Sequence, residues 1–187
     1  MRYHQPKGLN SVFEMGPIAL YGRSHENLRT FDYARSFLTM ADGSDVQRWA
    51  TAISTDLQAD RRIIFRYAEA FSPTFDRASQ PIRIIIVWKY ESERGQPMAE
   101  EHQRMNLLED ALKSALDQDH FATLALVSTG EDLREWTYYA KSEDEFMARL
   151  NFAFAGMSPF PVEIHIAHDP KWDTYEQFRA GVKEVVN

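Results

Sequence analysis

The chain has 187 residues, of which 44 % are hydrophobic and 13 % aromatic, so it is long and apolar enough to fold as one packed domain. Its 28 Asp and Glu outnumber its 21 Lys and Arg, and the formal charge of -7 opposes binding to the phosphate backbone of nucleic acids. The chain has no cysteine, which excludes disulfides, thiolate metal ligands and a cysteine nucleophile.

The N-terminal part of the chain differs in character from the rest. Gly, Pro and Asn interrupt residues 1–27, with single aromatic residues between them. We expect an irregular arm over residues 1–45 that contains a short helix around residues 28–40, followed by a single α+β domain over residues 46–187. There is no signal-peptide core and no run of about 18 apolar residues, so we expect a cytoplasmic protein with no membrane contact.

Three segments in the middle of the chain predict strands. Residues 49–55 and 62–71 are rich in β-branched and aromatic residues and are separated by a polar stretch, which indicates a pair of strands. Residues 82–90 are almost continuously apolar, as in a strand buried on both faces. Something has to cover the second face of that strand, and we favour a segment of the same chain over a second subunit.

Helices and strands alternate in the next part of the chain. After Pro97, apolar residues recur at helical spacing with oppositely charged i, i+4 pairs between them, which predicts a long amphipathic helix. Residues 121–129 and 133–140 predict two strands joined by a short Gly-containing turn. Ser142 and Glu145 have the spacing of a capping box and predict the start of a second helix.

Residues 161–168 alternate as a strand, and a last helix follows them. The order from residue 82 onward is then β-α-β-β-α-β, which folds with right-handed crossovers into a ferredoxin-like sandwich with two helices on one face of a four-stranded sheet. We expect an α+β fold made of this sandwich, extended by the two earlier strands and a C-terminal helix. A larger antiparallel sheet, with the earlier strands paired onto one edge, is a compatible alternative.

The segment HDPKWDTYEQF, residues 168–178, has two explanations. Asp169 is a favoured N-cap, and Pro170 is a favoured first residue of a helix. Trp172 and Tyr175 then fall on one helical face, so a capped helix that docks its aromatic side on the sheet explains the whole segment. We favour this structural explanation. The alternative is a binding site that uses Asp169, Trp172 or the hydroxyl of Tyr175.

The segment LREWTYY, residues 133–139, places Arg134, Trp136 and Tyr138 on one face of its predicted strand. An Arg between aromatic residues can hold a carboxylate or stack on a base. The segment lacks the Gly-containing pattern of RNA-recognition domains, and the acidic charge also opposes RNA, so we expect no nucleic acid. We favour a structural role, with contact to a ligand or a protein partner as the alternative.

The remaining polar residues predict neither a metal site nor a catalytic site. His165 and His168 are three apart on a predicted strand and point to opposite faces, so we expect no metal ion, and we expect no cofactor. Glu109 and Asp110 are neighbours on a helix and do not form an acid–base pair, so we expect both on a solvated face. No nucleophile elbow, phosphate-binding loop, dinucleotide fingerprint or H-E-x-x-H motif occurs, and no catalytic residue is predicted.

Four motifs occur in a fixed order: the W-x-Y of IVWKYESERGQP, the Leu-Glu-Asp of NLLEDALKSAL, the Thr-Gly turn of STGEDLREWTYYA, and HDPKWDTYEQF. Together they resemble domain-of-unknown-function family 695, a family of uncharacterised bacterial proteins, over roughly residues 50–178. The resemblance implies no activity and no catalytic residue, because none is established for the family. Related domains occur beside a ferredoxin-like regulator that inhibits ribonuclease E, which implies regulation by protein binding.

Two functions fit these observations. The first is a non-enzymatic interaction or regulatory protein, monomeric or homodimeric, whose acidic surface binds a basic protein partner. The second is a small-ligand-binding protein or an enzyme that acts on an anionic metabolite in a pocket between the sheet and the C-terminal helix. In that pocket Arg134 would hold the anion, with Asp169 and Tyr175 nearby, so the second function requires these three side chains to converge.

Overall fold

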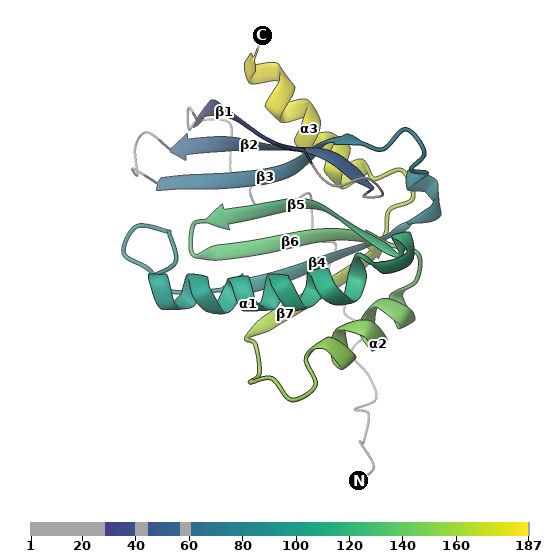
Figure 1. The fold of residues 1–187 in the computed structure, drawn as a ribbon. Coiled ribbons are helices and arrows are strands. Elements are labelled where there is room, and N and C mark those ends of the chain that lie inside the picture. The colour runs from purple at the N-terminus through teal and green to yellow at the C-terminus, as the bar shows by residue number, and fades with distance from the viewer. Residues whose placement is uncertain (1–28, 40–44, 57–60, 187) are drawn as a thin grey trace.

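The fold is built on one antiparallel sheet, as the computed structural model in Figure 1 shows. The structure describes residues 29–39, 45–56 and 61–186, with side chains described in 45–56 and 61–182. Within these ranges the sheet has seven strands in the order β1-β2-β3-β5-β6-β4-β7, and each neighbouring pair is antiparallel. The strands are β1 (Arg29–Thr39), β2 (Val46–Asp56), β3 (Arg61–Phe71), β4 (Ile82–Lys89), β5 (Ala122–Gly130), β6 (Leu133–Ala140) and β7 (Val162–His168).

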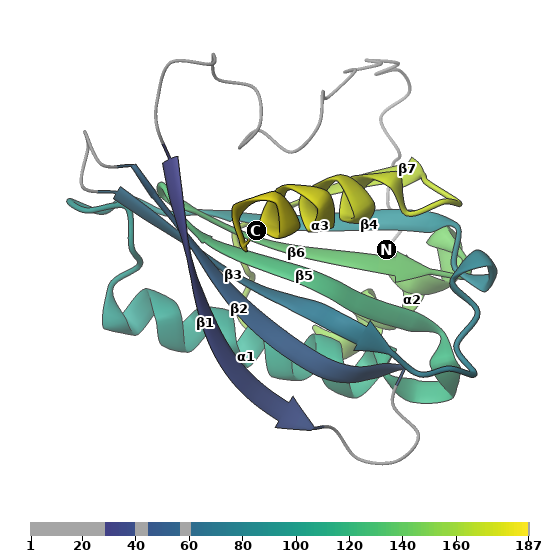
Figure 2. The same ribbon diagram turned by 90° about the horizontal axis from the view of Figure 1, so that it is seen from above.

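Helices cover opposite faces of this sheet. The helices are α1 (Ala99–Leu116), α2 (Glu143–Ala153) and α3 (Asp173–Val186), and two short 3₁₀ turns, η1 (Arg77–Ser79) and η2 (Gln118–His120), lie in connections. Figure 2 shows α1 and α2 on one side of the sheet and α3 on the other. The predicted α+β class is therefore confirmed, and the long helix after Pro97 begins at Ala99.

The sheet as a whole is larger than the four-stranded sandwich predicted from residue 82 onward. The strands from residue 82 onward occupy one end of the sheet in the order β5-β6-β4-β7, but β3 pairs with β5 and continues the sheet into β2 and β1. The seven-stranded order is therefore not that of a four-stranded sandwich. The alternative of a larger antiparallel sheet, with the earlier strands paired onto one edge, describes the structure.

The prediction of a short helix around residues 28–40 is wrong. That segment is β1, which pairs with β2 from Arg29 opposite Asp56 to Thr39 opposite Arg48, with one irregularity in the register. Pairing along a free edge satisfies the backbone groups of one side of the strand, and this gain overrides a weak local preference for helix. Residues 1–28, which belong to the predicted arm, lie outside the described residues.

Apolar cores lie on both faces of the sheet. The core under α1 and α2 joins Ile84, Ile86 and Trp88 of β4 to residues of both helices, including Leu108 and Phe146. The core under α3 joins Phe178 and Val182 to side chains of β2, β3 and β5, which are Ala50, Ala52, Ile63, Phe65, Tyr67 and Leu126. A segment of the chain itself therefore covers part of the second face.

Two local sequence signals form as predicted. The hydroxyl of Ser142 accepts a hydrogen bond from the N–H of Glu145 at 3.4 Å and caps α2. Glu131 and Asp132, both with positive φ, form the two-residue turn between β5 and β6. Gly130 precedes this turn with φ of 150°, where an added Cβ would lie 2.2 Å from a backbone oxygen of β3. Only glycine fits at that position.

Candidate protein-binding surface

One carboxylate, that of Glu109, joins α1 to the sheet. It accepts hydrogen bonds from a guanidinium nitrogen of Arg134 at 2.7 Å and from the indole nitrogen of Trp136 at 2.9 Å. Arg66 of β3 forms an ion pair with the other carboxylate oxygen. Burial has the largest effect on the pKa of Glu109 and raises it, but Arg66, Trp136 and Arg134 together hold that pKa below its ordinary value. The carboxylate is therefore ionised between helix and sheet.

This cluster places one set of predicted site residues in the interior. Arg134, Trp136 and Tyr138 belong to the face of β6 that α1 covers, and they are 7 %, 0 % and 1 % exposed. The guanidinium carbon of Arg134 also lies 5.0 Å from the ring centroid of Trp136. The polar groups of Arg134 and Trp136 stabilise the packing of α1, and a ligand would have to displace α1 to reach them.

The expectation of a solvated position is wrong for Glu109, although Asp110 is exposed. Glu109 lies four residues after Met105 and three before Leu112, and both of these side chains are fully buried. Helical spacing therefore already places Glu109 beside the core. This spacing is the signal that the sequence analysis missed.

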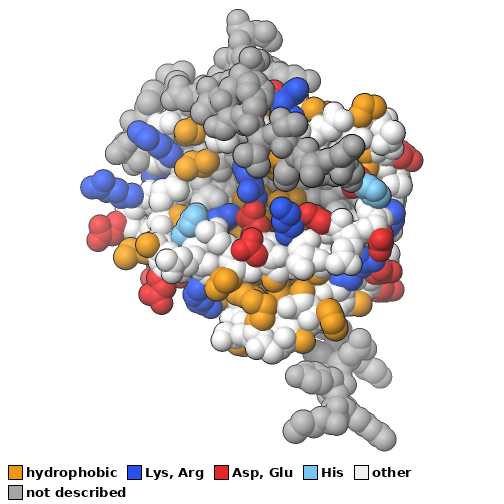
Figure 3. Space-filling view, viewed as in Figure 1, with side chains coloured by type: hydrophobic (Ala, Val, Ile, Leu, Met, Phe, Trp, Pro, Cys, Tyr) orange, Lys and Arg blue, Asp and Glu red, His pale blue; other side chains and the backbone are white. Residues whose placement is uncertain are grey.

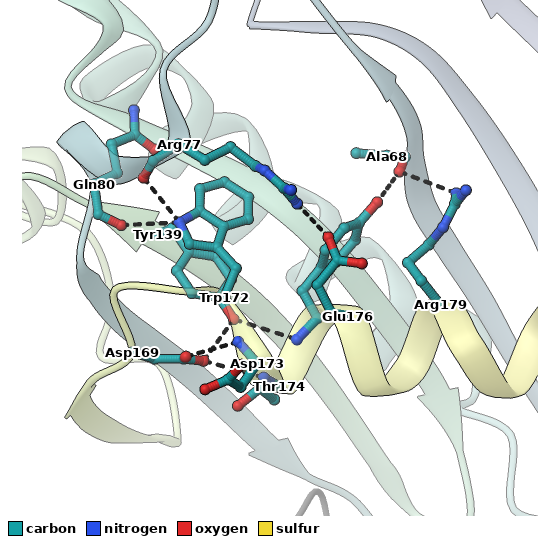
Figure 4. Close-up of polar contacts among 11 residues, drawn as sticks. Ala68, Arg77, Gln80, Tyr139, Asp169, Trp172, Asp173, Thr174, Glu176 and Arg179 are labelled. Atoms are coloured by element: carbon teal, nitrogen blue, oxygen red, sulfur yellow. Dashed lines mark hydrogen bonds and ion pairs between the residues drawn. The ribbon is translucent and has the colours of Figure 1, made fainter.

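The second set of predicted residues fixes the start of α3, which Figure 4 shows in close-up. The carboxylate of Asp169 accepts hydrogen bonds from the N–H of Asp173 at 2.7 Å and of Thr174 at 3.2 Å. Asp169 thus caps the helix, but α3 begins at Asp173 and not at Pro170. The residues between them form a turn that ends at Trp172, whose φ of 58° is left-handed.

Aromatic side chains then attach this end of α3 to the sheet. Trp172 is fully buried, and its indole N–H donates to the carbonyls of Arg77 and Gln80, both at 3.1 Å (Figure 4). The hydroxyl of Tyr175 donates to the carbonyl of Ala68 in β3. The polar groups of Asp169, Trp172 and Tyr175 are therefore all used in docking α3.

The two sets of residues lie on opposite faces of the sheet. Arg134 is covered by α1, whereas Asp169 and Tyr175 lie at the start of α3 on the other face. The three side chains do not converge. The pocket in which Arg134 would hold an anion beside Asp169 and Tyr175 is therefore not formed.

A groove of about 610 Å³ runs instead between α1 and α2, on their outer side. Small side chains leave this space, because alanine and serine occur where larger residues would fill the contact between the helices. The lining residues are Ala111, Ser114 and Ala115 of α1, Gln118 of η2, and Glu145, Ala148, Arg149, Phe152 and Ala153 of α2.

One of the large exposed apolar side chains lines this groove. Phe152, which lines it, is 84 % exposed. Of the five large hydrophobic side chains that are exposed in the described part of the chain, only Ile64 lies away from the two helices and their adjoining loops. The other three are Met98, Leu107 and Met157. Figure 3 shows hydrophobic side chains over this part of the surface. Aromatic side chains such as that of Phe152 are enriched in protein interfaces.

The same two helices are acidic. Apart from Glu109, which is held in ion pairs under α1, the two helices carry six carboxylates and three basic side chains. Arg149, the basic residue in the groove lining, is already bonded to Glu145, with 2.6 Å between nitrogen and oxygen. We call this region, formed by the groove with Phe152 and the exposed carboxylates of both helices, the α1–α2 surface. It combines an apolar centre with negative charge.

The fold and this surface define an α+β domain with a groove between two helices on the outer side of its sheet. The chain belongs to the Family of unknown function (DUF695), whose model matches residues 47–179, from β2 into α3. No curated protein matches the chain.

Two features are absent from the described residues. None of the helices there combines the length and the apolar character that crossing a membrane requires. No group of three or more His, Asp or Glu side chains is arranged there as metal ligands.

Proposed function

We propose that this protein is a non-enzymatic, cytoplasmic interaction domain that binds a basic protein through the α1–α2 surface. The observation that carries the proposal is the 84 % exposure of Phe152 beside the groove. Removing a Phe side chain from water is worth about 1.5–3 kcal/mol, and buried aromatic residues are frequent anchors of protein interfaces. Covering Phe152 with a partner therefore supplies a driving force for association.

Charge supports a basic partner. The excess of carboxylates on α1 and α2 attracts positively charged surfaces and repels acidic ones. A non-enzymatic role is supported by the candidate site residues that the sequence predicted. Their polar groups are engaged in packing α1 and α3, as described for Arg134, Trp136, Asp169, Trp172 and Tyr175.

The test is affinity capture from a lysate of the source organism, read by mass spectrometry at low and high salt. Three forms of the full chain are compared: the unchanged protein, Phe152→Asp, and Asn151→Asp. Asn151 is the exposed neighbour of Phe152 on α2 but does not line the groove, so it controls for the added charge.

We expect a basic protein to be captured by the unchanged chain and by Asn151→Asp at low salt. Capture should be lost with Phe152→Asp, and it should weaken at high salt. A partner that Phe152→Asp still retains, or one whose capture does not depend on salt, contradicts the proposal.

A further inference from the structure

We infer that the α1–α2 groove receives a single basic amphipathic α-helix of the partner, an inference that rests on the proposed function. The groove follows residues 111–118, which run from the end of α1 to the start of η2, and residues 145–153 of α2. At 1.5 Å per residue this is a length of about 12 Å, or roughly two helical turns. An occupant of two to three turns spans it.

The walls of the groove favour a helix over an extended peptide. An extended segment binds mainly through its backbone, and it needs free N–H and C=O groups on the receiving surface. The groove is walled by two helices and not by the edge of a sheet, so it offers no row of N–H and C=O groups to which an extended segment can add. A helical occupant satisfies its own backbone and needs no such partners.

The floor of the groove fits the close approach of another helix. Ala111 and Ala115 are four residues apart on α1 and face Ala148 of α2 across the groove. Such small side chains leave room for a row of larger apolar side chains from the occupant. Phe152, at the end of the α2 wall, adds an aromatic contact to that row. The occupant therefore has an apolar stripe.

Both walls carry carboxylates beside this floor. Asp110 and Asp117 are exposed and lie at i-4 and i+3 from Ser114, so helical spacing puts them on the α1 side of the groove. On α2, Asp144 is exposed next to Glu145, which lines the groove. Lys113 lies near Asp117, and Arg149 is bonded to Glu145, so the carboxylates exceed the basic side chains on both sides of the groove. The occupant that matches it has Lys or Arg on both flanks of its apolar stripe.

The experiment uses the full chain and four fluorescent synthetic peptides of equal length. The first has a Leu stripe flanked on both sides by Lys, and the second has the same stripe flanked by Glu. The third has the composition of the first in an order without a stripe, and the fourth is the first with two central prolines. Binding is measured by fluorescence anisotropy at low and high salt.

We expect only the first peptide to bind, at least about tenfold more tightly than the other three, with weaker binding at high salt. Ala148→Trp fills the groove without removing a charge, and it should weaken binding at least about tenfold. Asn151→Trp places the same bulk on α2 outside the groove and should leave binding unchanged. Circular dichroism verifies that both variants are folded.

Several results overturn the inference. These are equal binding of the acidic, unpatterned or proline-containing peptide, binding that Ala148→Trp does not weaken, and failure of the first peptide to bind at millimolar concentration. The proposed function is tested separately by lysate capture. If Phe152→Asp abolishes capture while the peptides show no preference, the surface binds protein but its occupant is not a basic helix. If Phe152→Asp retains the partner, the proposed function itself fails.

Discussion

The indole ring of Trp172 lies face to face with the phenol ring of Tyr139, with ring centroids 3.9 Å apart and planes 7° from parallel. The hydroxyl of Tyr139 also donates to the carboxylate of Asp169 at 2.9 Å. The stack and this hydrogen bond join the turn before α3 to β6. The start of α3 is thus held by packing and by hydrogen bonds at the same point.

Replacing Trp172 tests the value of this contact. Trp172→Ala removes a fully buried ring, and we expect the free energy of unfolding to fall by about 3–5 kcal/mol. Trp172→Phe keeps a ring for the stack but leaves the carbonyls of Arg77 and Gln80 without their donor, so its loss should be smaller. Urea unfolding of the three proteins measures both values, and equal losses would contradict the role of the stack.

Removing the carboxylate of Glu109 should strongly destabilise the attachment of α1. In Glu109→Ala the guanidinium of Arg134 is left buried without its ion-pair partner, and such losses cost about 3–5 kcal/mol. Asp110→Ala changes the exposed neighbour on the same helix and should alter stability by no more than about 0.5 kcal/mol. Chemical denaturation measures the free energy of unfolding of both variants. Similar losses of this free energy at the two positions would contradict the prediction.

Asp169 should make stability depend on acidic pH. Burial raises the pKa of Asp169, but the N–H groups of Thr174 and Asp173 and the hydroxyl of Tyr139 hold it below its ordinary value. Because the folded-state pKa is below the unfolded value of about 3.9, the stabilisation is complete above that value and is lost as the pH falls through the folded-state pKa.

We therefore expect the free energy of unfolding to fall below about pH 4, and to fall less in Asp169→Asn. Urea unfolding at a series of pH values measures both slopes. An unchanged slope in Asp169→Asn would show that other carboxylates carry the dependence.

Two glycines allow a matched test of backbone constraint. Gly130→Ala places a Cβ 2.2 Å from the carbonyl oxygen of Arg62 and should disrupt the pairing of β3 with β5, at a loss of more than about 3 kcal/mol. Gly156 also has positive φ, but an added Cβ there has no neighbour within 4 Å. Gly156→Ala should cost only about 1–2 kcal/mol of backbone strain. Thermal and urea unfolding would refute the prediction if the two losses were equal.

Local periodicity predicted most of the strands and helices, because their apolar residues repeat at strand or helix spacing. The exception was β1, which was predicted as a helix and forms a strand paired with β2. The sequence also did not predict which face of the sheet each helix covers. The residues around Arg134 and Asp169 do not indicate that α1 and α3 lie on opposite faces, because that arrangement depends on contacts between distant segments.

The exact roles of single residues also depend on contacts with distant segments. The capping role of Asp169 followed from its type, but the helix starts at Asp173 because the left-handed turn at Trp172 lets its indole stack on Tyr139. The groove was not predicted either. Ala111 and Ala148 are unremarkable in sequence, and they form a groove only because α1 and α2 lie side by side.

The position of α3 also sets an order of assembly. The hydroxyl of Tyr175 donates a hydrogen bond to the carbonyl of Ala68, which lies 107 residues earlier in the chain. The ring of Phe178 packs against Phe65 and Tyr67. During synthesis β2 and β3 leave the ribosome roughly 100 residues before the helix that covers them. Nascent or truncated chains without α3 therefore expose an apolar face of these strands, which makes them substrates for chaperones and seeds for aggregation.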